Sequence, residues 1–284
     1  MNFLPADFHA FIDPGCDRCR FIQERLGAAG ISTAVIPEGN ARHIYVQYPA
    51  SCYNPMFKIK TVIAHYDRAE GSPGANDNSA AVFQIMDWAA RLLQFKSIHN
   101  VRIIFSDGEE LPGVAELGSY QLANRFRRLG ITNDDVYVFD CCGRGDVLIV
   151  SDRASVPPGD KRFVRRYSSL IQRARSLASQ TSLGRWMTLP VPYSDNAAFM
   201  ACGIPAAAFT VLPAEEASAY SYALTRGSLS PESVMRCAAD VHDRLPLTWR
   251  HMHTADDNID NLTESAFKLM QRLLDNLAQL LTTA

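Results

Sequence analysis

Residues 101–110 read Val-Arg-Ile-Ile-Phe-Ser-Asp-Gly-Glu-Glu, an apolar run of strand length that is followed by three carboxylates within four residues. Similar apolar runs recur along the chain, and they alternate with segments whose apolar residues are three or four positions apart. This alternation is typical of an α/β domain, in which helices cover both faces of one central sheet. The predicted strands are residues 43–48, 60–65, 101–106, 136–140, 147–151 and 206–211.

Helices are predicted between and after these strands. The clearest follows residue 79, where Val82, Ile85 and Met86 begin one apolar face. Asn78 or Ser79 is well placed to cap this helix. The stretch 179–193 lacks a clear pattern and is predicted to be a loop. The other predicted helices are residues 19–28, 161–178, 231–244 (with Ser230 as its cap) and 263–281.

The composition is that of an ordinary folded protein, because 47% of the 284 residues are hydrophobic and 20% are charged. A formal net charge of −2 provides no positive field for a phosphate polymer, so we expect no nucleic-acid partner. The first residues lack a secretory pattern, and no run of about 18 apolar residues occurs, so we expect a cytoplasmic protein with no membrane partner. No pattern in the sequence specifies an oligomeric state.

No linker divides the chain, and we therefore expect one domain over residues 1–284, with residues 1–16 as an N-terminal extension. The seven cysteines are an odd number spread over a long chain, which indicates reduced thiols rather than a disulfide framework. Cys16 and Cys19 form a C-x-x-C pair without the second pair that a structural zinc site needs, so we assign them no metal or redox role.

Acidic and histidine residues follow several predicted strands, where open α/β sheets form a ligand crevice. His65 ends one strand and Asp67 follows it, and such a carboxylate can orient a metal-binding imidazole; the alternative is a histidine that caps a strand end. Asp77 lies at a helix entrance, where an N-cap role is the alternative. Of the adjacent Glu109 and Glu110, one can bind a metal while the other moves a proton; the alternative is a solvated loop.

Two further candidates are Asp140, which ends another predicted strand, and His253, in a histidine-rich loop before the final helix. Neither is informative alone. Together with the others, they supply the nitrogen and oxygen ligands that two divalent ions require, and one glutamate is left over. Zinc is the first choice of metal.

Six short motifs occur in a fixed order over residue 17 to the C-terminus. They are H-x-D (65–67), P-G-A-N-D-N (73–78), D-G-E-E (107–110), S-D-x-x-x-F (194–199), G-I-P-A (203–206) and H-T-x-x-D (253–257). This ordered set resembles the zinc aminopeptidase and glutaminyl cyclase family, metallopeptidase family twenty-eight. The resemblance implies a three-layer αβα sandwich around a mixed, mostly parallel sheet, with two zinc ions at its carboxyl edge.

The resemblance also implies a role for each motif residue. His65 and Asp140 would bind one zinc ion, Glu110 and His253 the other, and Asp77 would bridge them, with a cis peptide bond after Asp77.

Three further residues receive roles in the same way. Glu109 would be the general base, Asp67 would be the partner of His65, and Asp195 would line the pocket for a peptide with a free N-terminus. The chain departs from the family pattern in the longer loop after Glu110, which includes Pro112, and at Asn196, where histidine is common.

The sequence therefore predicts a dizinc exopeptidase, either an aminopeptidase or a di- or tripeptidase. One alternative is a glutaminyl cyclase, an acyltransferase that uses one zinc ion and forms N-terminal pyroglutamate. Another is a non-catalytic interaction module, which the presence of Glu109 and of all five ligand positions disfavours.

Overall fold

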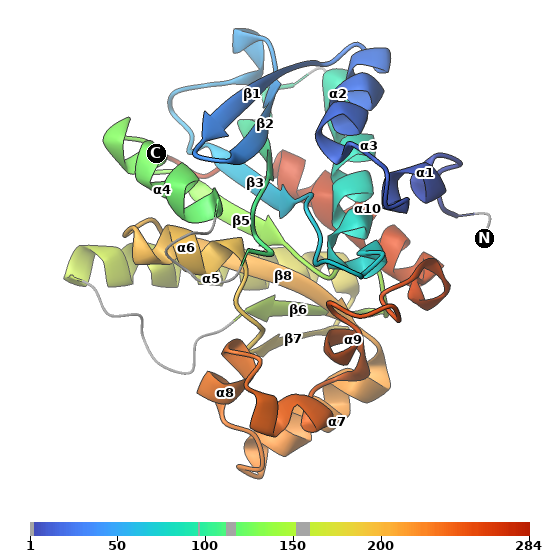
Figure 1. The fold of residues 1–284 in the computed structure, drawn as a ribbon. Helices are drawn as coiled ribbons and strands as arrows, with labels where there is room; N and C mark the ends of the chain where they lie inside the picture. Colours follow the sequence, from blue (N-terminus) through green and yellow to red (C-terminus); the bar gives the residue numbers. More distant parts are fainter. Residues whose placement is uncertain (1–2, 96, 112–117, 152–159) are drawn as a thin grey trace.

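The structure is a computed structural model that describes residues 3–95, 97–111, 118–151 and 160–284. Its described strands form one eight-stranded sheet in the order β1-β2-β4-β3-β5-β8-β6-β7 (Figure 1). They are β1 (Ser32–Glu38), β2 (Ala41–Gln47), β3 (Lys60–His65), β4 (Val101–Ser106), β5 (Asp135–Phe139), β6 (Val147–Ser151), β7 (Trp186–Leu189) and β8 (Ala206–Leu212).

The centre of the sheet is parallel. Strands β4, β3, β5 and β8 are parallel neighbours, whereas β2 is antiparallel to β1 and β4, and β6 is antiparallel to β8. Because the central strands are parallel, their carboxyl ends meet at one edge. The mixed, mostly parallel sheet predicted from the sequence is confirmed.

Helices cover both faces of the sheet, and β3 shows how its strands connect the two layers. Val62 and Ala64 belong to one buried cluster and Ile63 to the other, because successive side chains of a strand point to opposite faces. The first cluster includes side chains of α1 (Phe8–Ile12), α2 (Arg18–Ala28), α3 (Ala80–Leu93), α5 (Lys161–Ser182) and α10 (Glu264–Gln279). The second includes side chains of α4 (Gly118–Arg128), α6 (Asp195–Ala201), α7 (Ala214–Thr225), α8 (Pro231–Met235) and α9 (Leu247–Arg250).

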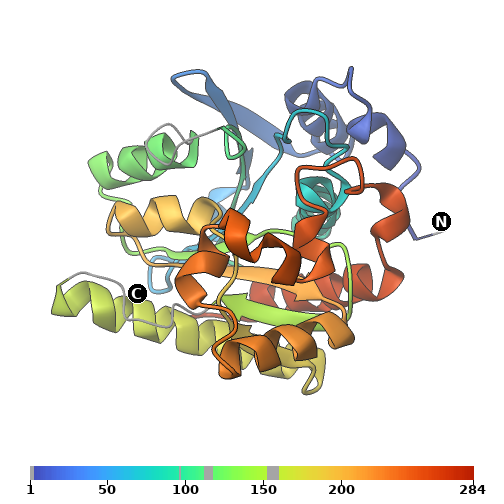
Figure 2. The ribbon, with the colours of Figure 1, turned by 60° about the horizontal axis from the view of Figure 1, so that its bottom comes forward.

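The remaining helical segments are short, and the views agree on where the later helices lie. Helices α7, α8 and α9 gather beside β6 and β7 (Figures 1 and 2). The short segments are η1 (Ala50–Cys52), the π-helical turn η2 (Ala75–Ser79), η3 (Ala239–Arg244) and η4 (Ile259–Asn261). Within the described ranges, no helix is both long enough and apolar enough to cross a membrane.

The structure corrects two predictions about local structure. The stretch 179–193 is not a loop throughout, since α5 extends to Ser182 and β7 follows. The helix predicted over 231–244 is broken, because Cys237 adopts a left-handed φ of 45° between α8 and η3. Within residues 1–16, the predicted N-terminal extension, Phe8 and Phe11 of α1 are fully buried in the core.

Candidate metal centre

The site begins at the carboxyl end of β3. All six residues of this strand are buried, and its last residue, His65, is 1% exposed. Asp67 lies two residues later, with Oδ1 3.5 Å from His65 Nδ1, while its Oδ2 accepts a hydrogen bond from the backbone N–H of Glu110. Asp67 therefore faces one ring nitrogen of His65, which suits its predicted role as the orienting partner of this imidazole, and Nε2 is directed elsewhere.

The loop that enters α3 places Asp77 against this second nitrogen. Oδ1 of Asp77 lies 3.1 Å from Nε2 of His65, and the peptide bond between Asp77 and Asn78 is cis, as predicted. Both oxygens of the Asp257 carboxylate accept hydrogen bonds from this loop, one from the N–H of Asn76 and one from the N–H of Asp77. The backbone of Asp77 is thus held by the buried carboxylate of Asp257, for which the sequence predicted no role.

The expected capping of α3 is wrong. The Ser79 hydroxyl donates to the carbonyl of Gly74, and the Asn78 side chain donates to the carbonyl of Phe139, so neither side chain caps the helix. Gly74 has a φ of 62°, and a Cβ there would lie 2.8 Å from the carbonyl oxygen of Asp77. These contacts fold the loop tightly and leave the Asp77 side chain free to face the histidines.

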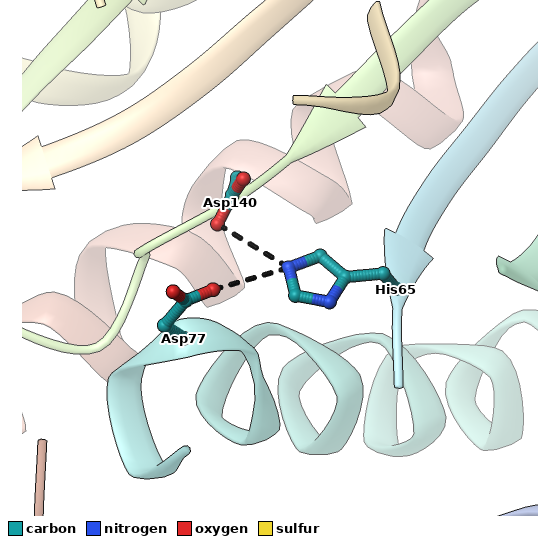
Figure 3. A group of neighbouring side chains, drawn as sticks. All are labelled: His65, Asp77 and Asp140. Atoms are coloured by element: carbon teal, nitrogen blue, oxygen red, sulfur yellow. Dashed lines mark ion pairs between the residues drawn. The ribbon is translucent and has the colours of Figure 1, made fainter. Parts of the chain in front are cut away.

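Asp77 lies between two groups of ligand atoms. On one side, Asp140 Oδ1 at the end of β5 lies 3.7 Å from His65 Nε2 (Figure 3). On the other side, His253 Nε2 lies 3.4 Å from Asp77 Oδ2 and 2.9 Å from Glu110 Oε2. Each carboxylate oxygen of Asp77 therefore faces a different histidine and a different second carboxylate.

The unpaired atoms of this site fit bound cations. Both ring nitrogens of His65, Oδ2 of Asp77, Oε1 of Glu110 and Oδ1 of Asp140 are buried without a hydrogen-bond partner of acceptable geometry. In the sets His65, Asp77 and Asp140, and Asp77, Glu110 and His253, ligand atoms lie within 4.8 Å of one another. Imidazole nitrogen and carboxylate oxygen are zinc ligands, so the residues present suit two zinc ions with Asp77 shared.

The electrostatics also indicate a need for positive charge. Burial raises the pKa of Glu109 well above its ordinary value, and the negative charges of Asp140 and Asp195 add to this effect against the opposing influence of His65. Hydrogen bonds to Asp77 and Glu110 raise the pKa of His253 to about 11. A site that holds protons this strongly has an excess of negative charge, which divalent cations would balance.

Most of the candidate ligands, but not the buried His65, line an open cleft of about 400 Å³. The acidic residues of its lining are Asp77, Glu109, Glu110 and Asp140, and His253 also lines the cleft. Ligand atoms of Glu109 lie within 4.8 Å of His65 and Glu110, so the predicted general base is next to the metal ligands. The rest of the lining is Leu111, Pro192, Tyr193, Met235, Arg236, Cys237 and Met252.

Comparison with known proteins identifies the family. The model of Peptidase family M28 matches residues 55–278. The chain belongs to this family. A comparison of this chain with curated proteins found no match.

Solved structures share its fold at low sequence identity. The LapA aminopeptidase of Legionella pneumophila is 16% identical with a TM-score of 0.64, and the match covers 95% of this chain and 69% of LapA. Glutaminyl cyclase from Porphyromonas gingivalis is 16% identical with a TM-score of 0.62, covering 98% of this chain and 99% of the cyclase. A Zn-dependent exopeptidase from Parabacteroides distasonis is 16% identical with a TM-score of 0.62, covering 97% and 95%.

The placement of Asp195 differs from the prediction. We expected it to line the substrate pocket, but its side chain is 0% exposed and it is not among the residues that line the cleft. Asp195 begins α6, and its Oδ2 accepts a hydrogen bond from the Ser106 hydroxyl at 2.5 Å. The start of α6 therefore directs this carboxylate toward the end of β4 instead of the cleft.

Besides Asp257, another buried residue of the site was missed in the sequence. Arg18, at the start of α2, is 6% exposed. It donates through Nη1 to the carbonyls of Tyr66 and Asp67 and through Nη2 to the carbonyl of Pro73. It joins the loop after His65 to the loop before Asp77. A single arginine in a helix carries no sequence signal for such a role.

The longer loop that includes Pro112 lies outside the described residues.

Proposed function

We propose that this M28 chain is a zinc-dependent aminopeptidase, or a di- or tripeptidase, that hydrolyses the first peptide bond of a peptide with a free N-terminus. The observation that carries the proposal is the position of Asp77, whose two oxygens face His65 with Asp140 and His253 with Glu110. A carboxylate placed in this way can bind two metal ions at once and hold them as close together as two-metal hydrolytic sites need.

The residues of the chain have separate roles in this proposal. When bound, two zinc ions would polarise the scissile carbonyl and lower the pKa of the attacking water. Glu109 accepts a proton from that water and delivers it to the nitrogen of the leaving amine as the C–N bond breaks. Asp67 keeps the His65 ring oriented, and Asp257 keeps the Asp77 backbone in place.

The test is a Glu109→Gln variant assayed for both metal and turnover. We expect two zinc ions per chain by elemental analysis in the wild type and in the variant. Release of chromophore from aminoacyl anilides should fall about 10²- to 10⁴-fold in the variant, because the proton acceptor is lost. Glu70→Gln, at an exposed position, is the matched control and should retain the wild-type rate.

Two results would contradict the proposal. Full turnover by Glu109→Gln would exclude this glutamate as the base. A gently purified chain without metal, whose activity zinc does not restore, would support a non-catalytic interaction module.

A second candidate function is glutaminyl cyclisation with one zinc ion. It is supported by the match to the Porphyromonas gingivalis cyclase over nearly the full length of both chains, which is similar in extent to the match to the Parabacteroides distasonis exopeptidase. The two reactions have different products, so ammonia release from peptides with N-terminal Gln is measured beside anilide hydrolysis. Ammonia release without anilide hydrolysis would overturn the peptidase proposal.

A further inference from the structure

The cleft has a second, less acidic part of its lining, formed by Pro192, Tyr193 and the segment Met235–Cys237. Arg236 is the only lysine or arginine among the described residues that line the cleft. Its side chain is exposed, whereas the preceding residue, Met235, is buried. One guanidinium therefore shares a cleft with four carboxylates.

The backbone that carries Arg236 is well fixed. The N–H of Tyr193 donates to the carbonyl of Met235 at 2.8 Å, which joins the two segments of this wall. The N–H groups of Arg236 and Cys237 donate to the carbonyls of Glu232 and Val234. Arg236 therefore lines the cleft from a backbone that main-chain hydrogen bonds hold in place.

The Arg236 guanidinium has no hydrogen bond and no ion pair in the part of the chain that the structure describes. This is unusual beside Asp77, Glu110 and Asp140, whose oxygens instead face His65 and His253. If two divalent cations bind there, as the proposed function requires, they balance the four carboxylates of the cleft. Arg236 then remains as an uncompensated positive charge that a bound anion can neutralise.

We propose that Arg236 forms a carboxylate-binding subsite of the cleft and makes the enzyme favour substrates with a carboxylate on the residue that follows the scissile bond. A guanidinium binds a carboxylate through two parallel hydrogen bonds, which gives both strength and orientation. The carboxylate can be the C-terminus of a dipeptide or the side chain of Asp or Glu. The inference rests on the proposed function, because it assumes that the cleft binds peptides.

The experiment compares matched substrates in wild type, Arg236→Gln and Arg236→Lys. The N-terminal residue, X, is the one whose anilide the wild type hydrolyses fastest. One pair is X-Glu-amide and X-Gln-amide, and the other is X-Gly and X-Gly-amide. The measured quantity is the ratio of kcat/KM within each pair. Arg226→Gln is the control, since Arg226 donates to the Tyr222 hydroxyl and is not among the lining residues of the cleft.

We expect the wild type to prefer the carboxylate member of at least one pair. Arg236→Gln should lower that ratio about ten- to hundredfold, and Arg236→Lys should restore part of it, because the charge remains without the planar fork. The pair that responds identifies whether the C-terminus or the side chain is bound. Arg226→Gln should leave both ratios unchanged.

A binding measurement provides a second readout. Calorimetry with the Glu109→Gln enzyme and the Glu109→Gln/Arg236→Gln double variant measures affinity for the preferred peptide without turnover. The second substitution should weaken it about ten- to hundredfold. Peptidase turnover with both ratios unchanged in Arg236→Gln would overturn this inference alone. No turnover of any peptide or anilide would overturn the proposed function and this inference with it.

Discussion

Charged groups are buried at both ends of the strands in the central sheet, but their partners differ. We call the end where β3 begins the amino edge and the end where β3 finishes the carboxyl edge. At the amino edge, the Lys60 ammonium donates to the carbonyls of Leu277 and Ala278 at the end of α10. Asp135 at the same edge accepts two hydrogen bonds of 2.7 Å from Arg173. The protein itself supplies partners for these charges.

At the carboxyl edge, buried ligand atoms of His65, Asp77, Glu110 and Asp140 remain without hydrogen-bond partners. Burying a charge without a partner is costly, so such a group is retained where it binds something that the chain does not supply. The difference between the edges indicates that the amino edge stabilises the fold and the carboxyl edge binds cations. Substitutions should therefore reduce stability at the first edge and function at the second.

The largest expected effect is at the carboxyl edge. Asp77→Asn removes the shared carboxylate while keeping its shape, and kcat/KM for anilide hydrolysis should fall about 10³-fold or more, since metal catalysis contributes several kcal/mol. Zinc per chain, measured by elemental analysis, should fall below two. Asp256→Asn, at an exposed neighbouring position, is the control and should keep both values. An Asp77→Asn variant with two zinc ions and full activity would remove the distinction between the edges.

The next effect is at the amino edge. Arg173→Met leaves the buried Asp135 without its two strong hydrogen bonds, and the free energy of unfolding should fall by about 3 kcal/mol in urea titration. Activity per folded molecule should not change, because Arg173 binds Asp135 at the start of β5, whereas the candidate ligands His65 and Asp140 lie where strands end. Arg20→Met breaks an exposed pair with Glu24 and should cost less than about 1 kcal/mol. Equal losses in the two variants would contradict the structural role of the Asp135 pair.

Protonation of His99, which is also at the amino edge, should make folding stability depend on pH. Burial, together with the charge of Lys60, lowers the pKa of His99 to about 4, and its Nδ1 accepts the N–H of Val101 and cannot be protonated without losing that bond. The unfolded chain takes up this proton near pH 6.5, the folded chain only near pH 4. The contribution of His99 to folding stability is therefore constant above pH 6.5 and decreases as the pH falls toward 4, by at most about 3 kcal/mol.

The measurement for this prediction is urea unfolding at pH 7 and pH 4.5. His99→Gln should lose about 2 kcal/mol less stability than the wild type between these two pH values. His242→Gln, at an exposed position, should behave as the wild type does. The same acid sensitivity in His99→Gln and wild type would show that this histidine does not titrate between them.

The smallest predicted effect concerns Arg18, which joins the loop after His65 to the loop before Asp77 at the carboxyl edge. Arg18→Met removes the donors that join the loop of Tyr66 and Asp67 to Pro73, and zinc affinity should fall about 10- to 100-fold. Competition with a chromophoric chelator, under conditions where both proteins are folded, measures this change. Arg18→Lys should recover part of the affinity. Unchanged affinity in Arg18→Met would limit this residue to a packing role.

The sequence predicted the central strands and missed the two outermost ones. β3 and β4 were predicted with the bounds that the structure shows, because strands covered on both faces are continuous apolar runs. β1 and β7 lie at the edges of the sheet and are partly exposed, so their residues have no such run. Edge strands are therefore harder to predict from hydrophobic pattern alone.

The candidate site was predictable where its residues occur in motifs at strand ends. His65, Asp77, Glu110, Asp140 and His253 were all assigned from the resemblance, and the structure brings them together. Side-chain direction was not predictable in this way. Asp195 also lies in a motif, but the start of α6 turns it into the core.

The most direct test of a two-metal site with Asp77 shared is anomalous scattering at the zinc edge from crystals grown with zinc. We expect two peaks per chain, one beside His65 and Asp140 and one beside His253 and Glu110, each in contact with one oxygen of Asp77. A single peak that leaves one of these pairs empty, or no peak at all, would contradict the central claim that Asp77 is shared between two metal ions.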